Sequence, residues 1–355
     1  MRVFLAHILP KAQINNYRVA QASHNFCYTL IEAQVFDKVY SIMPSNVKGR
    51  KSDFVDKSYD LVYSGFRRCK YTLKLAALLE NIKLFFKLRK GDFLWLYNVT
   101  VINILLVKLL KFFKPGVYIF PIVLDFSPEL KQCKAMLPSI NKADGMITLS
   151  NSPLFTVKNS ICLAGVVPQV VPNHETIGGE IKREFLLSGN LSEQICMLKI
   201  LLPAFSRMPD YILHISGRAQ DKKLLDKFVE RYNNIVYHGL LSYQEYIKLL
   251  EEIPFVLSTR NPNSPENQCN FPSKIIEGLL YNRIIVSTIE YPQLKGINYF
   301  KISSDEDSMI RDITEICKIK DADLMNYANQ SVQVHKLFSA ERWEIIMSQI
   351  EHCAE

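Results

Sequence analysis

The sequence predicts an α/β fold made of two doubly wound parallel sheets, each in a domain of its own. Short apolar runs alternate with segments of helical periodicity along most of the chain, which is the pattern of parallel strands buried between helices. The 355 residues exceed what one hydrophobic core ordinarily organises. Residues 171–182 contain a proline, two glycines and no periodicity, so we expect them to link the two domains.

The first series of elements starts at the first residues of the chain. Its apolar runs predict strands at residues 2–8, 36–42, 93–97, 117–123 and 145–150. Apolar residues at helical spacing predict helices at about residues 17–33, 66–90, 101–113 and 129–141. Residues 45–65 are polar and irregular. We expect these elements to form an N-terminal domain of residues 1–170.

The second series repeats the alternation. It predicts strands at residues 184–188, 211–216, 235–238, 253–257, 284–286 and about 298–302. It predicts helices at residues 192–207, 220–232, 242–251, 306–318, 322–337 and 340–353, and one that begins at Ser273. We expect a second domain of residues 183–335, and a last helix, within residues 336–355, that crosses back to the first domain.

Composition narrows the class of protein. Hydrophobic residues make up 48% of the chain and charged residues 22%, which is typical of a globular protein. The eight cysteines are scattered without a C-x-x-C pair or a Cys/His cluster, so we expect no disulfide framework and no zinc site. The longest uncharged run, residues 93–107, is too short for a membrane span. The first eleven residues read as a strand and not as a signal peptide, so we expect a cytoplasmic protein.

The positive charge is concentrated in the first half. Residues 48–114 hold 15 Lys/Arg and 5 Asp/Glu, so the rest of this +8 chain is slightly acidic. This asymmetry indicates an anionic partner. The basic amphipathic segments within residues 66–114 are either surface helices with solvated lysines or a face that lies on anionic lipid at the inner membrane surface. No nucleic-acid recognition module accompanies the charge, so we expect no nucleic-acid partner.

Residues 258–288 contain several features that indicate a ligand-binding site. An apolar strand ends in a proline-punctuated polar loop, a helix begins at Ser273, and a second apolar strand follows. In open α/β sheets such a loop lies at the carboxyl edge, where ligands bind. We expect Ser273 to be the N-cap of the helix, whose first N–H groups would face an anion such as a diphosphate. Lys274 adds a positive charge there, and Glu277 lies one turn later, where it can accept a hydrogen bond from a sugar hydroxyl.

Three glycines follow successive strands of the second series, namely Gly189, Gly217 and Gly239. Glycine lets the backbone approach a ligand closely, although a single one is ordinary turn chemistry. Three such glycines at the ends of successive strands, followed by the helix that begins at Ser273, favour a ligand-binding crevice over ordinary turns. Neither G-x-G-x-x-G nor a P-loop is present, which argues against a dinucleotide enzyme and against a kinase or ATPase.

These residues resemble the donor domain of retaining GT-B glycosyltransferases, family 4 in type. That family has glycines at the three positions just described and a loop reading E-x-F-G-x-x-x-x-E. Here the loop reads C-N-F-P-S-K-I-I-E, so Phe271 and Glu277 match, Cys269 replaces the first glutamate, and Pro272 replaces the glycine. The resemblance implies two Rossmann-like domains facing a central cleft, and in the first half it extends only to the rhythm of the elements.

By resemblance, Glu277 binds the ribose of a nucleotide sugar, and the turn at Gly189–Asn190 and the Ser273 helix hold its diphosphate. Backbone near Gly217 and at His238–Gly239 flanks the base, although His238 is more simply explained as a structural strand-end histidine. The family's phosphate-binding Arg and Lys are absent, which leaves three candidate cations: Arg218, Arg260 and Lys274. Three residues are candidates for contacts with the transferred sugar or the acceptor: Glu266, Asn270 and Asp125. Asp125 can equally be a helix cap.

The expected function is hexosyl or N-acetylhexosaminyl transfer from a nucleotide sugar to a glycan, with a polyprenyl-diphosphate-linked acceptor and retention of configuration. No cofactor or metal is expected, because no D-x-D ends a strand and a helix N-terminus with cations can stabilise a departing diphosphate. Two alternatives stay open. A sugar-nucleotide epimerase would convert its donor without any acceptor, and a non-catalytic binding subunit would neither transfer nor hydrolyse it.

Overall fold

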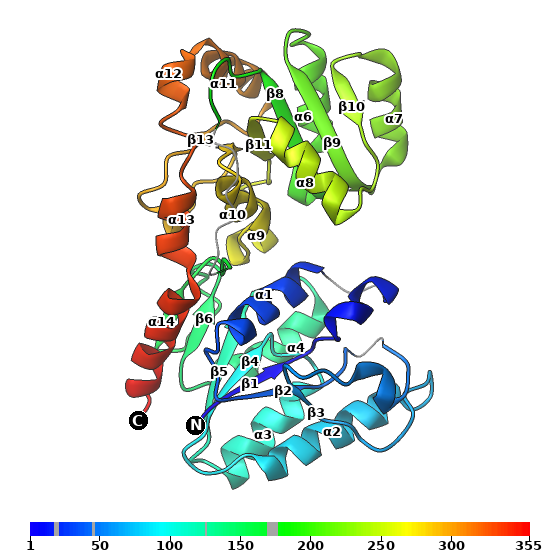
Figure 1. The fold of residues 1–355 in the computed structure, drawn as a ribbon, viewed down its shortest axis with the longest axis vertical. Helices are drawn as coiled ribbons and strands as arrows, with labels where there is room; N and C mark the ends of the chain where they lie inside the picture. The colour runs from blue at the N-terminus through cyan, green and yellow to red at the C-terminus, as the bar shows by residue number, and fades with distance from the viewer. Residues whose placement is uncertain (18–20, 45–46, 125, 169–176) are drawn as a thin grey trace. The chain divides into compact units, whose positions relative to one another are not determined.

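The computed structural model describes residues 1–17, 21–44, 47–124, 126–168 and 177–355. The chain divides into two compact units: unit 1 comprises Met1–Gln169 and Phe338–Glu355, and unit 2 comprises Val170–Leu337. Asp125 and the first half of the expected linker lie outside the described residues. The described parts are shown in Figure 1.

Unit 1 is built on one parallel sheet. Its strands are β1 (Arg2–Ala6), β2 (Lys38–Ser41), β3 (Asp60–Leu61), β4 (Phe93–Tyr97), β5 (Tyr118–Val123), β6 (Met146–Thr148) and β7 (Ser160–Cys162). They lie in the order β3-β2-β1-β4-β5-β6-β7, and every neighbouring pair is parallel. The strand order therefore reverses between β1 and β4.

Helices cover both faces of this sheet. They are α1 (Gln21–Glu32), α2 (Leu73–Lys87), α3 (Asn103–Phe113), α4 (Lys131–Ile140) and α14 (Ala340–His352). Helices α2 and α3 lie side by side on one face, and α1 lies on the other (Figure 1). Helix α14 joins the α1 side, where the ring of Trp343 packs edge-on against Phe26 at 5.1 Å.

Unit 2 repeats this architecture. Its strands are β8 (Glu184–Leu191), β9 (Ile212–Ala219), β10 (Ile235–Tyr237), β11 (Phe255–Ser258), β12 (Ile284–Ser287) and β13 (Phe300–Lys301), in the order β10-β9-β8-β11-β12-β13. Its helices are α5 (Glu193–Cys196), α6 (Leu198–Ser206), α7 (Lys222–Arg231), α8 (Tyr243–Glu252), α9 (Pro265–Cys269), α10 (Ser273–Leu280), α11 (Glu306–Lys318), α12 (Asp321–Leu324) and α13 (Ser331–Phe338). All neighbouring strands are parallel, with the reversal between β8 and β11.

The predicted fold class is therefore confirmed, since both units are Rossmann-like sheets wrapped by helices. None of the helices in the described part of the chain is both long and apolar enough to span a membrane.

The sequence-based element boundaries fail where the backbone turns left-handed. The expected helix 192–207 breaks at Met197, whose φ of 48° cannot continue a right-handed helix. The expected helix 322–337 is divided into α12 and α13 by residues 325–330, which include Asn329 with a φ of 56°. The short edge strands β3 and β7 were missed because two or three residues carry too little apolar periodicity.

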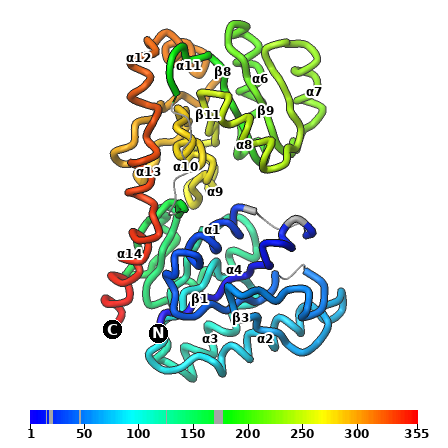
Figure 2. Tube along the Cα trace, in the orientation of Figure 1, coloured from blue at the N-terminus to red at the C-terminus, as the bar shows by residue number. Residues whose placement is uncertain are grey.

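The two chain ends meet in unit 1 (Figure 2). The guanidinium of Arg2 donates to both carboxylate oxygens of Glu351, at 2.7 and 2.6 Å. The indole of Trp95, a fully buried residue of the central strand β4, donates to the same carboxylate at 2.6 Å. Nearer the start of α14, Trp343 donates to the Gly165 carbonyl at 2.7 Å. One buried carboxylate thus fastens the last helix to the first strand.

Replacing Glu351 with alanine should destabilise unit 1 by about 3 kcal/mol, because Arg2 and Trp95 would keep buried donors without an acceptor. Both tryptophans of the chain lie in unit 1, so tryptophan fluorescence during urea unfolding reports this unit. Glu344→Ala, an exposed change on the same helix, should alter stability by less than about 0.5 kcal/mol. Equal effects of the two variants would refute this role of Glu351.

Candidate functional site

The candidate site lies at the carboxyl edge of the unit 2 sheet, where β8 and β11 separate. At this point the chain leaves β8 toward one side of the sheet and leaves β11 toward the other. Ligands of open α/β sheets bind at such reversals, because the diverging loops leave a crevice there. The segment after β11 contains α9 and then α10, which begins at Ser273 as predicted.

Three glycines form a row along this edge. Gly189 of β8 pairs with Gly217 of β9, and the Gly217 amide donates to the Gly239 carbonyl at 2.8 Å. A Cβ on Gly217 would stand 1.9 Å from the Gly189 carbonyl oxygen, so no other residue can occupy that position without moving the strands. A Cβ on Gly189 or Gly239 would meet nothing within 4 Å. The edge is therefore bare backbone with open space beside it.

The structure corrects the expected turn at Gly189–Asn190. Pairing continues past the glycines, since Asn190 lies opposite Arg218 and Leu191 opposite Ala219. Gly189 and Gly217 are strand residues with φ of 121° and 135°, a region that glycine alone adopts freely. Asn190 and Arg218 are both exposed at this end.

Lys274 and Glu277 are bound to each other in the first turns of α10. The Lys274 ammonium lies 2.6 Å from the Glu277 carboxylate, and both side chains are partly exposed. The hydroxyl of Tyr246, on α8, donates to the same carboxylate oxygen at 3.0 Å. Lys274 also lies over the Tyr246 ring, 3.8 Å from its centroid. The three side chains thus form one cluster from two helices.

Tyr246 is a site residue that the sequence did not reveal. Burial and the Glu277 carboxylate raise the pKa of Tyr246 well above its ordinary value, while the neighbouring Ser188 hydroxyl acts in the opposite direction. The phenol therefore stays protonated and can only donate to Glu277. The Ser188 hydroxyl has no hydrogen-bond partner by distance and angle among the described residues, so it is a neighbour of the Tyr246 phenol at the residue before Gly189 and not a bonded link to the glycine row. The sequence does place Tyr246 on the apolar side of α8, and a buried tyrosine hydroxyl usually has a hydrogen-bond partner, so this position could have indicated a polar contact.

The start of α10 differs from the prediction in one respect. Ser273 is the first residue of the helix and is exposed, and its N-cap is Pro272. Proline has no side-chain acceptor, and no side chain caps this helix. The expected N-cap role of Ser273 is therefore wrong, and the Ile275 amide of the first turn donates to the Pro272 carbonyl at 3.0 Å.

Arg260 follows β11 and is held in place by the loop. Its guanidinium donates to the Asn267 side chain at 3.1 Å, and Asn267 in turn donates to the carbonyls of Gln194 and Asn261 at 2.9 and 2.8 Å. Burial raises the pKa of the Cys196 thiol to about 12, and the positive charge of Arg260 opposes that rise. Arg260 therefore lies near the segment that follows β8. Nothing in the sequence around Asn267 marked it as the residue that ties these loops together.

The other candidate residues between Glu266 and Phe271 differ in how exposed they are to solvent. Phe271 is buried and packs edge-on against Tyr291 at 4.9 Å, so it offers a ligand its backbone and not its ring. Cys269, at the position of the family's first glutamate, is also buried. Asn270 is 9% exposed, and Glu266 is partly exposed in the first turn of α9. Of the two acidic or amide candidates for the transferred sugar, Glu266 is thus the more accessible.

His238 belongs to a stacked histidine pair. Its Nε2 lies 3.0 Å from Nδ1 of His214, and the ring planes are 19° apart. His214 Nε2 lies 3.4 Å from the Glu184 carboxylate. Burial lowers the pKa of both histidines, and Glu184 opposes the shift at His214. The ring of His238 is occupied by this contact, so its contribution to a ligand site is the backbone next to Gly239.

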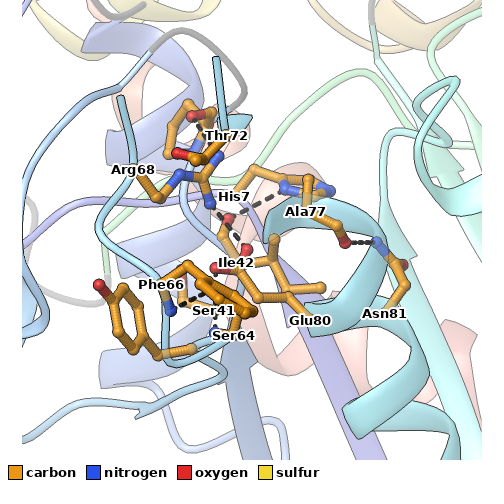
Figure 3. Close-up of polar contacts among 12 residues, drawn as sticks. His7, Ser41, Ile42, Ser64, Phe66, Arg68, Thr72, Ala77, Glu80 and Asn81 are labelled. Carbon is orange, nitrogen blue, oxygen red and sulfur yellow. Dashed lines mark hydrogen bonds and ion pairs between the residues drawn. The ribbon is translucent and has the colours of Figure 1, made fainter. Parts of the chain in front are cut away.

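The equivalent edge of unit 1 is filled with polar side chains (Figure 3). His7, directly after β1, contacts the Ile42 carbonyl and the Asn103 side chain, each at 3.0 Å. Beside it, Arg68 and Glu80 form an ion pair at 2.7 Å with both side chains fully buried. Burial raises the pKa of the Glu80 carboxyl to about 6, and Arg68 opposes that rise. These contacts indicate a structural role for His7. Asp125, the acceptor-side candidate, lies outside the described residues.

Among the described His, Cys, Asp and Glu side chains, no three come together in a way that could hold a metal ion. Independence from metal stays a prediction.

Comparison with known proteins gives likeness of fold only. No family model matches the chain, and no curated protein matches it. Among solved structures it is similar to HepE of Anabaena in complex with UDP and glucose, at 13% identity and a TM-score of 0.63, over 99% of this chain and 98% of that one. It is also similar to the lipopolysaccharide outer core galactosyltransferase WaaB, at 16% identity and a TM-score of 0.60, over 99% of each chain.

A third similar structure, TarM, has 14% identity and a TM-score of 0.56; the match covers 76% of this chain and 58% of TarM, so the chain spans a little over half of that protein. Together these likenesses define the class of fold: two Rossmann-like domains of the GT-B type.

Gly217→Ala should destabilise unit 2 by about 3 kcal/mol, because the new Cβ would overlap the Gly189 carbonyl in addition to the strain of a positive φ. Gly239→Ala is the matched control, since its φ is also positive but its Cβ would meet open space. It should cost about 1 kcal/mol. Calorimetric unfolding measures both, and a Gly217 variant no less stable than the Gly239 variant would contradict the close approach.

Unit 2 should lose stability as the pH falls below about 6.5. In the unfolded chain His214 and His238 take up protons near that pH. In the folded pair burial lowers their pKa, so the unfolded state binds more protons and is favoured in acid. For His214, whose side chain is 16% exposed, the loss is at most about 1.4 kcal/mol per pH unit.

The melting temperature between pH 7.5 and 5.5 tests this (roughly one unit on either side of the histidine pKa). His214→Gln should flatten the pH dependence, and the exposed His352→Gln should leave it as in the wild type. An unchanged slope in His214→Gln would show that the pair is not responsible.

Proposed function

We propose that this protein is a glycosyltransferase that moves a sugar from a nucleoside diphosphate sugar to a glycan acceptor. The observation that carries the proposal is the Lys274–Glu277 pair in the first turns of α10, where the Tyr246 hydroxyl holds the Glu277 carboxylate. A cation and a carboxylate at an uncapped helix start suit a phosphate and a sugar hydroxyl. Support comes from the HepE structure of similar fold, which contains UDP and glucose.

The donor diphosphate would lie at the first turn of α10. The N–H groups of that turn, Lys274 and Arg260 would supply the positive potential there. Glu277 would accept a hydrogen bond from the ribose, and backbone near Gly217 and Gly239 would flank the base, since the space beside Gly189 and Gly239 is open. Arg218, exposed at the end of β9, is a further cation within the same edge.

Binding would exchange one set of contacts for another. Without a ligand, Lys274 and Glu277 neutralise each other. With a donor, Lys274 would turn to a phosphate while Tyr246 keeps hold of the Glu277 carboxylate. Such a prepared carboxylate loses little side-chain freedom when the ribose binds, which favours affinity.

The chemistry would rest on stabilising the leaving diphosphate. Negative charge grows on that group as the sugar–oxygen bond breaks, and the start of α10 would stabilise it together with Lys274 and Arg260 once Lys274 has turned to the phosphate. We propose that no metal takes part and that the anomeric configuration is retained, in line with the resemblance of residues 269–277 to the retaining family. Glu266 and Asn270 are the proposed contacts to the transferred sugar.

For the acceptor we propose a glycan linked to a polyprenyl diphosphate, at the cytoplasmic face of a membrane. The support is the concentration of basic and apolar residues within 66–114, which suits an acceptor held at an anionic surface.

Lys274→Ala and Glu277→Ala should each weaken the binding of UDP or a UDP-sugar by about 10- to 100-fold, because each removes one charge-assisted hydrogen bond. Isothermal titration calorimetry measures this. The matched control is the exposed ion pair between Lys318 and Glu315 on α11, whose alanine variants should bind as the wild type does. Wild-type affinity in both α10 variants would refute the donor site.

The same titrations with other nucleoside diphosphates identify the base. Transfer of a labelled sugar to an acceptor then separates the enzyme from a binding subunit, and an epimerised donor without acceptor would identify an epimerase.

A further inference from the structure

The exposed apolar side chains of this protein are unevenly distributed. Of the sixteen large apolar side chains exposed in the described chain, nine lie between Phe66 and Phe113. That segment is 48 of the 355 residues. Single exposed apolar residues are ordinary, but a contiguous group marks an interaction site.

Helix α2 has an apolar stripe on the side opposite the core. Leu75, Leu78 and Phe86 are 51%, 36% and 73% exposed, and their spacing places them on one side of the helix. The residues buried against unit 1 lie on the other side: Ala76, Ala77, Glu80, Asn81 and Leu84. Helix α2 therefore has apolar residues on two sides, and only one of these sides packs against the core of unit 1.

Helix α3 repeats this arrangement. Val101, just before it, and Leu105 and Phe112 within it are 53%, 36% and 77% exposed and share one side. The buried side carries Asn103, Leu106, Val107 and Leu110. Helices α2 and α3 lie side by side (Figure 1), and each carries its exposed stripe on the side opposite its buried residues.

Lys114 fastens the two helices together at their C-terminal ends. Its ammonium donates to the carbonyls of Phe85 and Leu88 at 2.7 Å each and lies over the Phe85 ring, 4.5 Å from its centroid. This contact brings the end of α3, with Phe112 and Phe113, to the end of α2, with Phe86. We call the exposed sides of the two helices, with these three phenylalanines, the α2–α3 face.

The charge around this face has one sign. Residues 66–114 contain eleven Lys/Arg and two Asp/Glu. Both acidic side chains are buried: Glu80 pairs with Arg68, and Asp92 accepts from the Arg89 amide at 2.7 Å. Lys111 is paired with Asp144. The lysines exposed beside the stripes include Lys74 and Lys87 on α2 and Lys108 on α3.

We propose that the α2–α3 face docks on an anionic lipid bilayer. Its leucines and phenylalanines would enter the boundary between headgroups and acyl chains, and its lysines would contact lipid phosphates. The lysines beside the apolar stripes favour a lipid surface over a protein partner, because the apolar centre of a protein interface is ordinarily depleted of lysine. Docking by this face rests on the proposed function in that it would bring the protein to a lipid-linked acceptor. The binding of vesicles itself needs neither donor nor acceptor.

Vesicle flotation tests the proposal with phosphatidylcholine vesicles that do or do not contain phosphatidylglycerol. The protein should float only with the anionic vesicles and should be released by high salt, because screening weakens the contact between lysines and phosphates. The double variants Phe86→Ser/Phe112→Ser and Lys74→Glu/Lys108→Glu should each lower the bound fraction by at least about tenfold. All four residues are exposed, so both variants should keep the wild-type melting temperature.

Matched controls lie in unit 2. Val332→Ser removes an apolar side chain that is 65% exposed, and Lys223→Glu/Lys227→Glu reverses two exposed charges on α7. Both should bind vesicles as the wild type does. Equal binding of wild type and face variants would overturn the proposal, as would binding to neutral vesicles or a dimer that Phe86→Ser/Phe112→Ser dissociates. UDP binding by the face variants should be unchanged, so loss of vesicle binding and failure of the donor site are separate results.

Discussion

The close approach of the Gly189 carbonyl to Gly217 is the constraint on which the unit 2 site depends. With no Cβ at Gly217, β8 and β9 stay paired to their last residues, and Gly239 joins them through a hydrogen bond from the Gly217 amide. Gly189 and Gly239 therefore present partly exposed backbone with open space beside it. Any side chain in this row would either separate the strands or occupy the space that a ligand needs.

The cluster on α10 adds charge to that edge. Tyr246 reaches from α8 to hold the Glu277 carboxylate, and Lys274 lies across both. Each of the two charged side chains is stabilised by the other in the absence of a ligand, so neither is left uncompensated. A diphosphate and a sugar hydroxyl can replace these contacts one for one, which makes the cluster suitable for reversible binding.

The two units share a strand order but use their carboxyl edges differently. In unit 1 the edge is closed by the contacts of His7 with Asn103 and by the buried pair of Arg68 and Glu80. The chemistry that unit 1 presents to solvent lies instead on its outer helices, as the α2–α3 face. A common scaffold thus carries a bare edge in one unit and a basic, apolar outer surface in the other.

The two doubly wound sheets could be predicted from the sequence, since apolar periodicity is a local property of each segment. The sequence also identified the start of α10, the charges of Lys274 and Glu277, and the basic helices. Which residues of distant segments contact each other could be learned only from the three-dimensional structure. Tyr246 meets Glu277, His214 meets His238, and Gly189 meets Gly217 only because strand order places distant segments side by side. The left-handed conformations of Met197 and Asn329 likewise escaped prediction, because both residue types also occur in helices.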